Sequence, residues 1–359
     1  MKTILDWISD WVRRILPNPQ AVSFAIFLLV TSLLVLTLGQ MLMPVLAAGV
    51  IAYLLDGIVM AAVNRRVPRT AAVIVVYALF LTFLAILLVA LLPSLYQQTM
   101  QLIQQLPGWV TTGQTLVLEL PDKYPDFITE DQLIELMATV RRELLAWGQS
   151  MLTYSYASLV SIITLVVYLI LVPLLVFFFL MDKEDILAWG SQYLPADRYL
   201  SHQVWDEVDM QIGNYVRGKF FEVLILFASS FAVFGLLDLN YALLLSVLMG
   251  LSVIIPYVGA TLVTFPVVLV AFFQWGISDH LGYLILAYSI IQTVDAVLLI
   301  PLLFSEVVNL HPVAIIVSIL LFGGLWGFWG VFFAIPLATL VHAILNAWPK
   351  REESAAGSA

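Results

Sequence analysis

Residues 239–278 read LNYALLLSVLMGLSVIIPYVGATLVTFPVVLVAFFQWGIS and contain no Asp, Glu, Lys or Arg. Residues 307–349 form a second run without these charged side chains. A helix needs about 20 apolar residues to cross the hydrocarbon core of a bilayer, so each run is roughly twice the length of one straight span. Proline and glycine also interrupt each run near its middle. The sequence therefore predicts two broken membrane helices in the C-terminal half.

The composition extends this conclusion to the whole chain. Of its 359 residues, 62% are hydrophobic and 11% are charged, whereas soluble domains are nearer half apolar and a quarter charged. A soluble fold with so few charges would not cover its surface with polar groups. Uninterrupted apolar runs are typical of helices and not of the alternating strands of a membrane barrel. We expect an all-α integral membrane protein, a polytopic helical bundle of about eight spans.

The apolar runs divide the chain into consecutive segments. We expect an amphipathic helix over 1–20, three spans within 21–93, an extracytoplasmic helical segment over 94–155, a fourth span over 156–180, a cytoplasmic polar segment over 181–218, a C-terminal transport bundle over 221–346 and a disordered tail over 347–359. The first three spans are predicted at 21–39, 42–63 and 71–93, and the bundle holds a fifth span at 221–237, the broken runs 241–274 and 311–346, and a continuous span at 281–304.

The basic residues indicate the orientation. If the N-terminus is cytoplasmic, all but three of the 15 Lys and Arg residues fall on the cytoplasmic side. The exceptions are Lys123, Arg141 and Arg142, all within 94–155. Because basic loops stay in the cytoplasm, this asymmetry predicts that both termini are cytoplasmic.

Other features exclude whole classes of function. The chain has no cysteine, which excludes disulfides, thiolate nucleophiles and cysteine-ligated metals. A net charge of −9 argues against nucleic acid as a partner, because binding to phosphates needs clustered Lys and Arg. Neither an HExxH nor a GxSxG motif occurs, and the four histidines lie far apart. We expect no enzymatic activity, no cofactor and no metal site.

The segment 94–155 contains a heptad seam. Apolar residues recur in steps of four and three, which is typical of a helix that packs along one stripe. They are Leu133, Met137, Val140, Leu144, Trp147 and Met151. One interpretation is packing on the amphipathic stretch Leu95–Leu106 of the same subunit. The other is a contact between subunits.

Ionisable residues inside apolar stretches are the first candidates for a site, because a charge within a span usually faces a cavity or a partner. Asp295 is the deepest of these, and Gln292 lies three residues earlier on the same helix face. Asp295 would be a proton or cation site or a gate, or else it makes a structural hydrogen bond between helices. Asp56 in the second span is a similar but weaker candidate, because Gly57 and nearby arginines suggest a place near the interface.

Glu222 follows Arg217 and Lys219 closely. This spacing favours a salt bridge at the membrane interface over a direct role with substrate.

The two breaks are the second kind of candidate, since interrupted helices expose backbone groups that are tolerated only along a cavity or inside protein. The first break contains Pro256 and Gly259, and the second contains Gly323, Gly324 and Gly327. Paired breaks of this kind often mark the substrate site of a transporter. Each run is either a hairpin of two short arms or one long kinked span, and the charge pattern does not decide between them.

Several motifs resemble the autoinducer-2 exporter family. They are QIGNYVRGKFFEVLI at 211–225, LMGLSVIIPYVGATLVTFP at 248–266 and NLHPVAIIVSILLFGGLWGFWGVFFAIPLATL at 309–340, with weaker matches at 43–59 and 177–186. The third motif carries His311, which we add to the candidate path residues. The likeness covers most of the chain except 94–155 and the termini, and it is strongest to the PerM-type permeases of that family. Asp56-Gly57 and Asp295-Ala296 depart from the family's usual Asn-Pro and acid-Asn pairs.

The resemblance implies a transporter in the bacterial inner membrane. It implies either a signalling molecule such as autoinducer-2 as the solute, or a monovalent cation in exchange for protons. It also implies a homo-oligomer such as a pentamer. A channel-like or scaffolding oligomer without coupled transport is the alternative that the sequence leaves open.

Overall fold

The computed structural model describes residues 19–118, 139, 142, 159–192, 199–256, 258–304 and 311–347, and every regular element in these ranges is helical. The predicted all-α polytopic fold is therefore confirmed. The elements are α2 (Pro19–Val63), α3 (Arg69–Ile86), the π-helix η1 (Leu87–Leu91), α4 (Leu92–Leu118), α7 (Leu159–Met181), α8 (Lys183–Ser191), α9 (Tyr199–Leu236), α10 (Ala242–Ser252), α11 (Val258–Trp275), α12 (Asp279–Val294), the π-helix η2 (Asp295–Leu299), α13 (Ile300–Phe304), α14 (Pro312–Phe332) and α15 (Ala334–Ala347).

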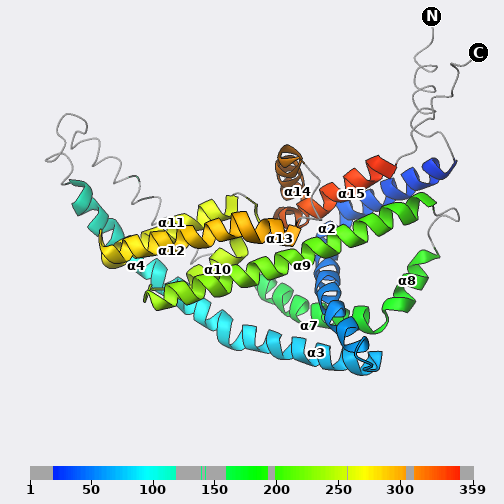
Figure 1. Ribbon diagram of the computed structural model, residues 1–359, viewed down its shortest axis with the longest axis horizontal. Coiled ribbons are helices and arrows are strands. Elements are labelled where there is room, and N and C mark those ends of the chain that lie inside the picture. The colour runs from blue at the N-terminus through cyan, green and yellow to red at the C-terminus, as the bar shows by residue number, and fades with distance from the viewer. Residues whose placement is uncertain are drawn as a thin grey trace, which may run out of the picture. The chain divides into compact units, whose positions relative to one another are not determined.

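Six of the described helices are long and apolar enough to cross a membrane, and the bent pair α7–α8 raises this number to seven. The predicted number was about eight. The predicted spans 21–39 and 42–63 fall on one continuous helix, α2, which is bent along its length and has Pro44 inside it (Figure 1). Likewise, helix continues from Arg69 to Leu118 through α3, η1 and α4, without a break near the predicted boundary at 93.

The helices form two compact units. Unit 1 consists of Met1–Tyr77, Leu171–Glu222 and Ala296–Ala359, and unit 2 consists of Ala78–Ile170 and Val223–Asp295.

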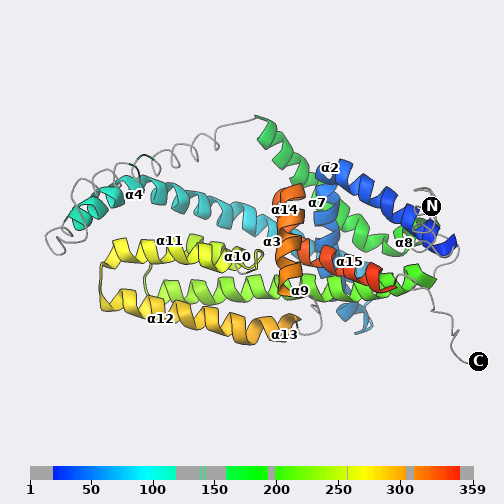
Figure 2. The same cartoon turned by 90° about the horizontal axis from the view of Figure 1, so that it is seen from above.

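The core of unit 2 forms where α10, α11 and α12 lie side by side (Figures 1 and 2). Leu245, Met249, Val267 and Leu284 are fully buried in it. The amphipathic stretch Leu95–Leu106 belongs to α4, and its apolar side packs against this core. Unit 2 is thus held together mainly by apolar side chains that several neighbouring helices contribute to one shared core.

The first charge-free run doubles back on itself within unit 2. The side chain of Gln274, at the end of α11, closes the base of the hairpin: its Nε2 donates to the Asp238 carbonyl (2.7 Å) and its Oε1 accepts from the Asn240 amide (2.8 Å). At the other end, Gly259 lies so close to the Ser252 carbonyl that a Cβ would overlap it. With 11 residues, α10 is about 16 Å long, too short to cross a bilayer alone.

The second run turns sharply inside unit 1. Gly327 has a φ of 58° and a ψ of −133°, which interrupts the helix between Pro312 and Phe332. Behind this turn, Gly330 packs against the carbonyl of Phe322, again with no room for a Cβ. Only glycine adopts such a dihedral combination readily, so the break lies where the sequence predicts it.

Unit 1 has its own apolar core beside this turn. Tyr215 and Val216 of α9 pack with Ile315 of α14 and Ile335 of α15. The Tyr215 hydroxyl also donates to the Phe332 carbonyl at 3.3 Å. This bond satisfies a backbone group next to the turn, where helical hydrogen bonding is interrupted.

Candidate functional site

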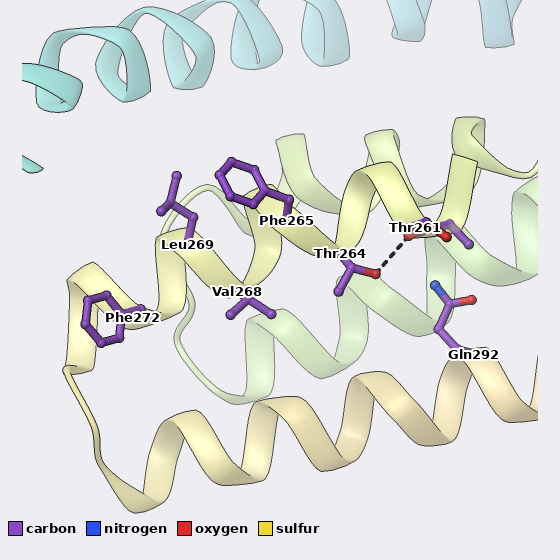
Figure 3. A pocket seen from close by; sticks show the side chains of 8 residues that line it. Thr261, Thr264, Phe265, Val268, Leu269, Phe272 and Gln292 are labelled. Carbon is purple, nitrogen blue, oxygen red and sulfur yellow. Dashed lines mark hydrogen bonds between the residues drawn. The ribbon is translucent and has the colours of Figure 1, made fainter. Parts of the chain in front are cut away.

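A groove of about 670 Å³ opens along one face of α11 in unit 2 (Figure 3). Gln292 reaches it from α12, and all other lining residues come from α11. They are Ala260, Thr261, Thr264, Phe265, Val268, Leu269 and Phe272. None of these side chains is charged. Figure 3 shows the polar residues at one end and Phe272 at the other, so the groove has a polar head and an apolar body.

A chain of hydrogen bonds holds the polar end. The Nε2 of Gln292 donates to the Tyr288 hydroxyl at 2.9 Å, and this hydroxyl lies 2.8 Å from Oγ1 of Thr264. Thr264 in turn donates to the Ala260 carbonyl at 2.8 Å. The Tyr288 hydroxyl also lies 3.3 Å from the Ala260 carbonyl, so it donates either to that carbonyl or to Thr264. Among the described residues, the Oε1 of Gln292 has no hydrogen-bond partner, which leaves an acceptor at the head of the groove.

Asp295 follows this polar end on the same helix. It is 6% exposed and begins η2, and its amide donates to the carbonyls of Ile291 and Gln292. Short π-helical turns are rare in proteins and frequently occur at functional sites. The predicted pair of Gln292 and Asp295 therefore lies within one helical turn, with an uncharged hydrogen-bonding group followed by a buried acid.

Glu222 lies in unit 1 and is almost fully buried. Its Oε2 accepts from Nζ of Lys219 at 2.7 Å, with the two side chains 1% and 8% exposed. Lys219 Nζ also lies 5.1 Å from the centre of the Phe304 ring. The salt bridge suggested by the spacing is present, but it is buried within a candidate span instead of lying at an exposed interface.

Two further predicted residues of unit 1 bind to neighbouring helices. Arg217 is exposed and donates to the Tyr53 hydroxyl at 2.9 Å, with its guanidinium 5.1 Å from the ring centre. Asp56 accepts from Lys183 Nζ at 2.7 Å. Both contacts connect helices, and neither residue lines the groove along α11.

The remaining predicted residues shape the backbone. Gly259 directly precedes the groove residue Ala260, and Pro256 lies in the turn between α10 and α11. His311 caps α14, because its Nδ1 accepts from the Val313 amide at 3.3 Å. Gly323 packs against Val331, whose Cγ2 would lie 2.9 Å from a Cβ, whereas Gly324 has open space around it.

The heptad residues Leu133, Met137, Val140, Leu144 and Trp147 lie outside the described residues, and their contacts stay a prediction.

Sequence reasoning missed Tyr288 and Thr264. Tyr288 lies four residues before Gln292, so the helical period puts both on one face, and this spacing was the available signal. Thr264 gave no local signal, because its role depends on the turn between Trp275 and Asp279 that brings α11 beside α12.

The broken, apolar helices define a polytopic helical membrane protein, with a groove in unit 2 that has one polar end. Comparison with known proteins identifies the family: the AI-2E family of transporters matches residues 21–350, and the chain belongs to it. The resemblance inferred from the motifs is thus confirmed.

Relatives agree with this assignment. The chain is 42% identical to "Putative permease PerM" of Escherichia coli (strain K12), over 96% of this chain and 98% of the relative. It is 25% identical to "Putative transport protein YueF" of Bacillus subtilis (strain 168), over 85% and 84% of the two chains. A third relative, "Putative transport protein sll0063" of Synechocystis, is 27% identical over 89% and 85%. The family and these names support a membrane transporter.

Proposed function

We propose that this chain is a secondary transporter of the bacterial inner membrane, with both termini cytoplasmic, which binds a small solute in the α11 groove. The observation that carries the proposal is the uncharged groove that ends at Gln292, one turn before the buried acid Asp295. Apolar pockets with few, well-placed polar groups suit small-molecule binding. A buried acid in a membrane helix suits proton or cation binding.

The lining favours a neutral solute over a charged one. No Lys or Arg lines the groove, so an anionic group would have no counter-charge there. The free acceptor on Gln292 suits a hydroxyl or N–H donor on the solute. We assign the solute to the groove and the coupling proton or monovalent cation to Asp295, which combines the two kinds of cargo that the family resemblance implies.

Transport by purified protein in liposomes tests this proposal. The first assay measures uptake of labelled autoinducer-2 under an imposed proton gradient. The second measures Na⁺- or K⁺-driven proton movement with a pH dye inside the vesicles. We expect gradient-dependent solute uptake. Ohmic conductance in planar bilayers without gradient-driven uptake would instead support a channel, and no flux in any assay would support a scaffold.

Three variants separate the two roles. Gln292→Leu keeps the size of the side chain but removes the amide, and we expect roughly tenfold weaker solute uptake from the loss of one hydrogen bond. Asp295→Asn should abolish the response to the gradient while solute exchange continues. Thr293→Val, between them on an exposed position, is the control. If Asp295→Asn leaves flux and its pH dependence unchanged, Asp295 has a structural role only.

A further inference from the structure

Helix α8 leaves the end of α7 at a steep angle. The two helices are separated by Asp182 alone and are bent by 81° relative to each other (Figure 1). The 23 residues of α7 contain no charged side chain and give a length of about 34 Å, enough to cross the hydrocarbon core. A helix almost perpendicular to a spanning helix runs close to parallel with the membrane plane, because spanning helices tilt by only about 20° on average.

The side chains of α8 separate into two faces. Ile186, Leu187 and Trp189 are 38%, 51% and 63% exposed, and the helical period places all three on one apolar arc. The opposite arc carries Glu184, Asp185, Ala188 and Ser191. Lys183, at the start of the helix, falls on the apolar arc by the same period, and its ammonium group is paired with Asp56. Exposed apolar side chains on one side and acids on the other are typical of a helix that lies in a membrane interface.

Two ion pairs fix the first turn of α8 to unit 1. Lys183 Nζ lies 2.7 Å from Oδ2 of Asp56 in α2, and Arg69, the first residue of α3, is paired with Glu184. Arg69 also donates to the carbonyl of Leu180 at 3.5 Å, next to the bend. The charges therefore gather near the start of α3 and the end of α7, with Asp56 in the last turns of α2, as expected for groups near the headgroups.

We propose that α8 is an interfacial helix whose apolar face, formed by Ile186, Leu187 and Trp189, inserts between the lipid headgroups and the upper acyl chains. Tryptophan favours this depth because its ring is both apolar and able to hydrogen-bond. The partner is the lipid surface itself, because Glu184 is paired with Arg69 and Lys183 with Asp56, which leaves the apolar face to make the contact. The helix anchors the end of α7 at a fixed depth.

The absence of cysteine in the native chain allows a direct test. Single-cysteine variants Leu187→Cys, Trp189→Cys and Ile186→Cys sample the apolar face, and Ala188→Cys and Asp185→Cys sample the polar face. Each full-length variant is labelled with a nitroxide and reconstituted in phosphatidylcholine vesicles. Accessibility is then measured to oxygen, which concentrates in lipid, and to a nickel chelate, which stays in water.

We expect the oxygen-to-nickel accessibility ratio to be several-fold higher at 186, 187 and 189 than at 185 and 188. Higher nickel accessibility at all five positions would overturn the proposal, because the helix would then lie in water. Exclusion of both reagents from the apolar face would also overturn it and would indicate a protein partner. Unchanged elution on size exclusion serves as the folding criterion, and three independent positions on the apolar face guard against the failure of any one variant.

Discussion

At the scale of single residues, a charge inside an apolar span can be neutralised by a neighbour on the same helix. The clearest case is the pair Lys219–Glu222, which is buried in a candidate span with a distance of 2.7 Å between the charged atoms. A buried pair is weak evidence for net stability, because both ions lose their hydration. Removing one partner alone is costly, since it leaves a buried charge without compensation. This asymmetry yields a test.

We expect Lys219→Met to lower the free energy of unfolding by about 3–5 kcal/mol, because Glu222 would keep its charge without the lysine. The double variant Lys219→Met with Glu222→Leu should recover most of that loss, since it removes both charges and keeps the volume. Thermal unfolding in detergent, followed by tryptophan fluorescence, measures both. Equal stability of the single variant and the wild type would contradict the assignment of a buried pair.

A second residue-scale prediction concerns Tyr288, which connects Gln292 to Thr264 through its hydroxyl. Tyr288→Phe keeps the ring but leaves two polar groups without this partner, at a cost of about 1–3 kcal/mol. The amide of Gln292 would then rotate more freely, so solute uptake should weaken. Tyr283→Phe, an exposed tyrosine of the same helix, is the matched control and should leave stability and uptake unchanged.

At the scale of elements, glycines decide where the broken runs can turn. Gly330 and Gly259 each touch a backbone carbonyl of the preceding arm, so that no other residue fits without moving a helix. Backbone, unlike a flexible side chain, gives way only at considerable cost. The two turns thus depend on the absence of a Cβ at particular positions and not on a general flexibility of glycine.

Gly330→Ala and Gly324→Ala form a matched pair within one helix. We expect Gly330→Ala to destabilise unit 1 by about 1–3 kcal/mol or more, because the new Cβ overlaps the Phe322 carbonyl. Gly324→Ala meets open space and should be neutral or stabilising, by about 0.5–1 kcal/mol. Unfolding temperatures in detergent compare them. Similar values for the two variants would show that the close approach at Gly330 does not exist.

Sequence and structure agree best at these breaks. Pro256, Gly259 and the Gly323–Gly327 stretch mark the turns because proline and glycine act locally, through missing donors and side chains. Near residues 40 and 93 the apolar runs are interrupted but the helices are not, so the predicted span boundaries there do not coincide with helix ends. Polar residues such as Gln97 and Gln98 mark the end of an apolar run, but they do not stop a helix, and Gln98 instead accepts from the Leu244 amide.

At the scale of the whole molecule, composition was sufficient for the class of protein but not for its internal arrangement. Scarce charge predicts a membrane bundle whatever the order of its helices. The groove cannot be derived from composition, because Thr264 and Gln292 are close only after the turn between α11 and α12 has brought these helices together. Likewise, α8 lies in a segment that the sequence predicts only to be polar. Its nine residues include three large apolar side chains, which is a weak signal for an interfacial helix. The 81° bend at the end of α7 is what gives this signal its meaning.

The oligomeric state belongs to this scale, and the heptad seam of 133–151 supplies its test. If the seam joins subunits, Leu144→Glu places a charge in an apolar contact of every subunit, and desolvation with like-charge repulsion should dissociate the oligomer. Native mass spectrometry of the detergent-solubilised protein measures the masses, with Arg142→Glu, off the seam and exposed, as the control. If the Leu144→Glu variant keeps the mass of the wild-type oligomer, the seam does not join subunits. It would then pack within one subunit, against the amphipathic stretch Leu95–Leu106, and the contact between subunits would lie elsewhere.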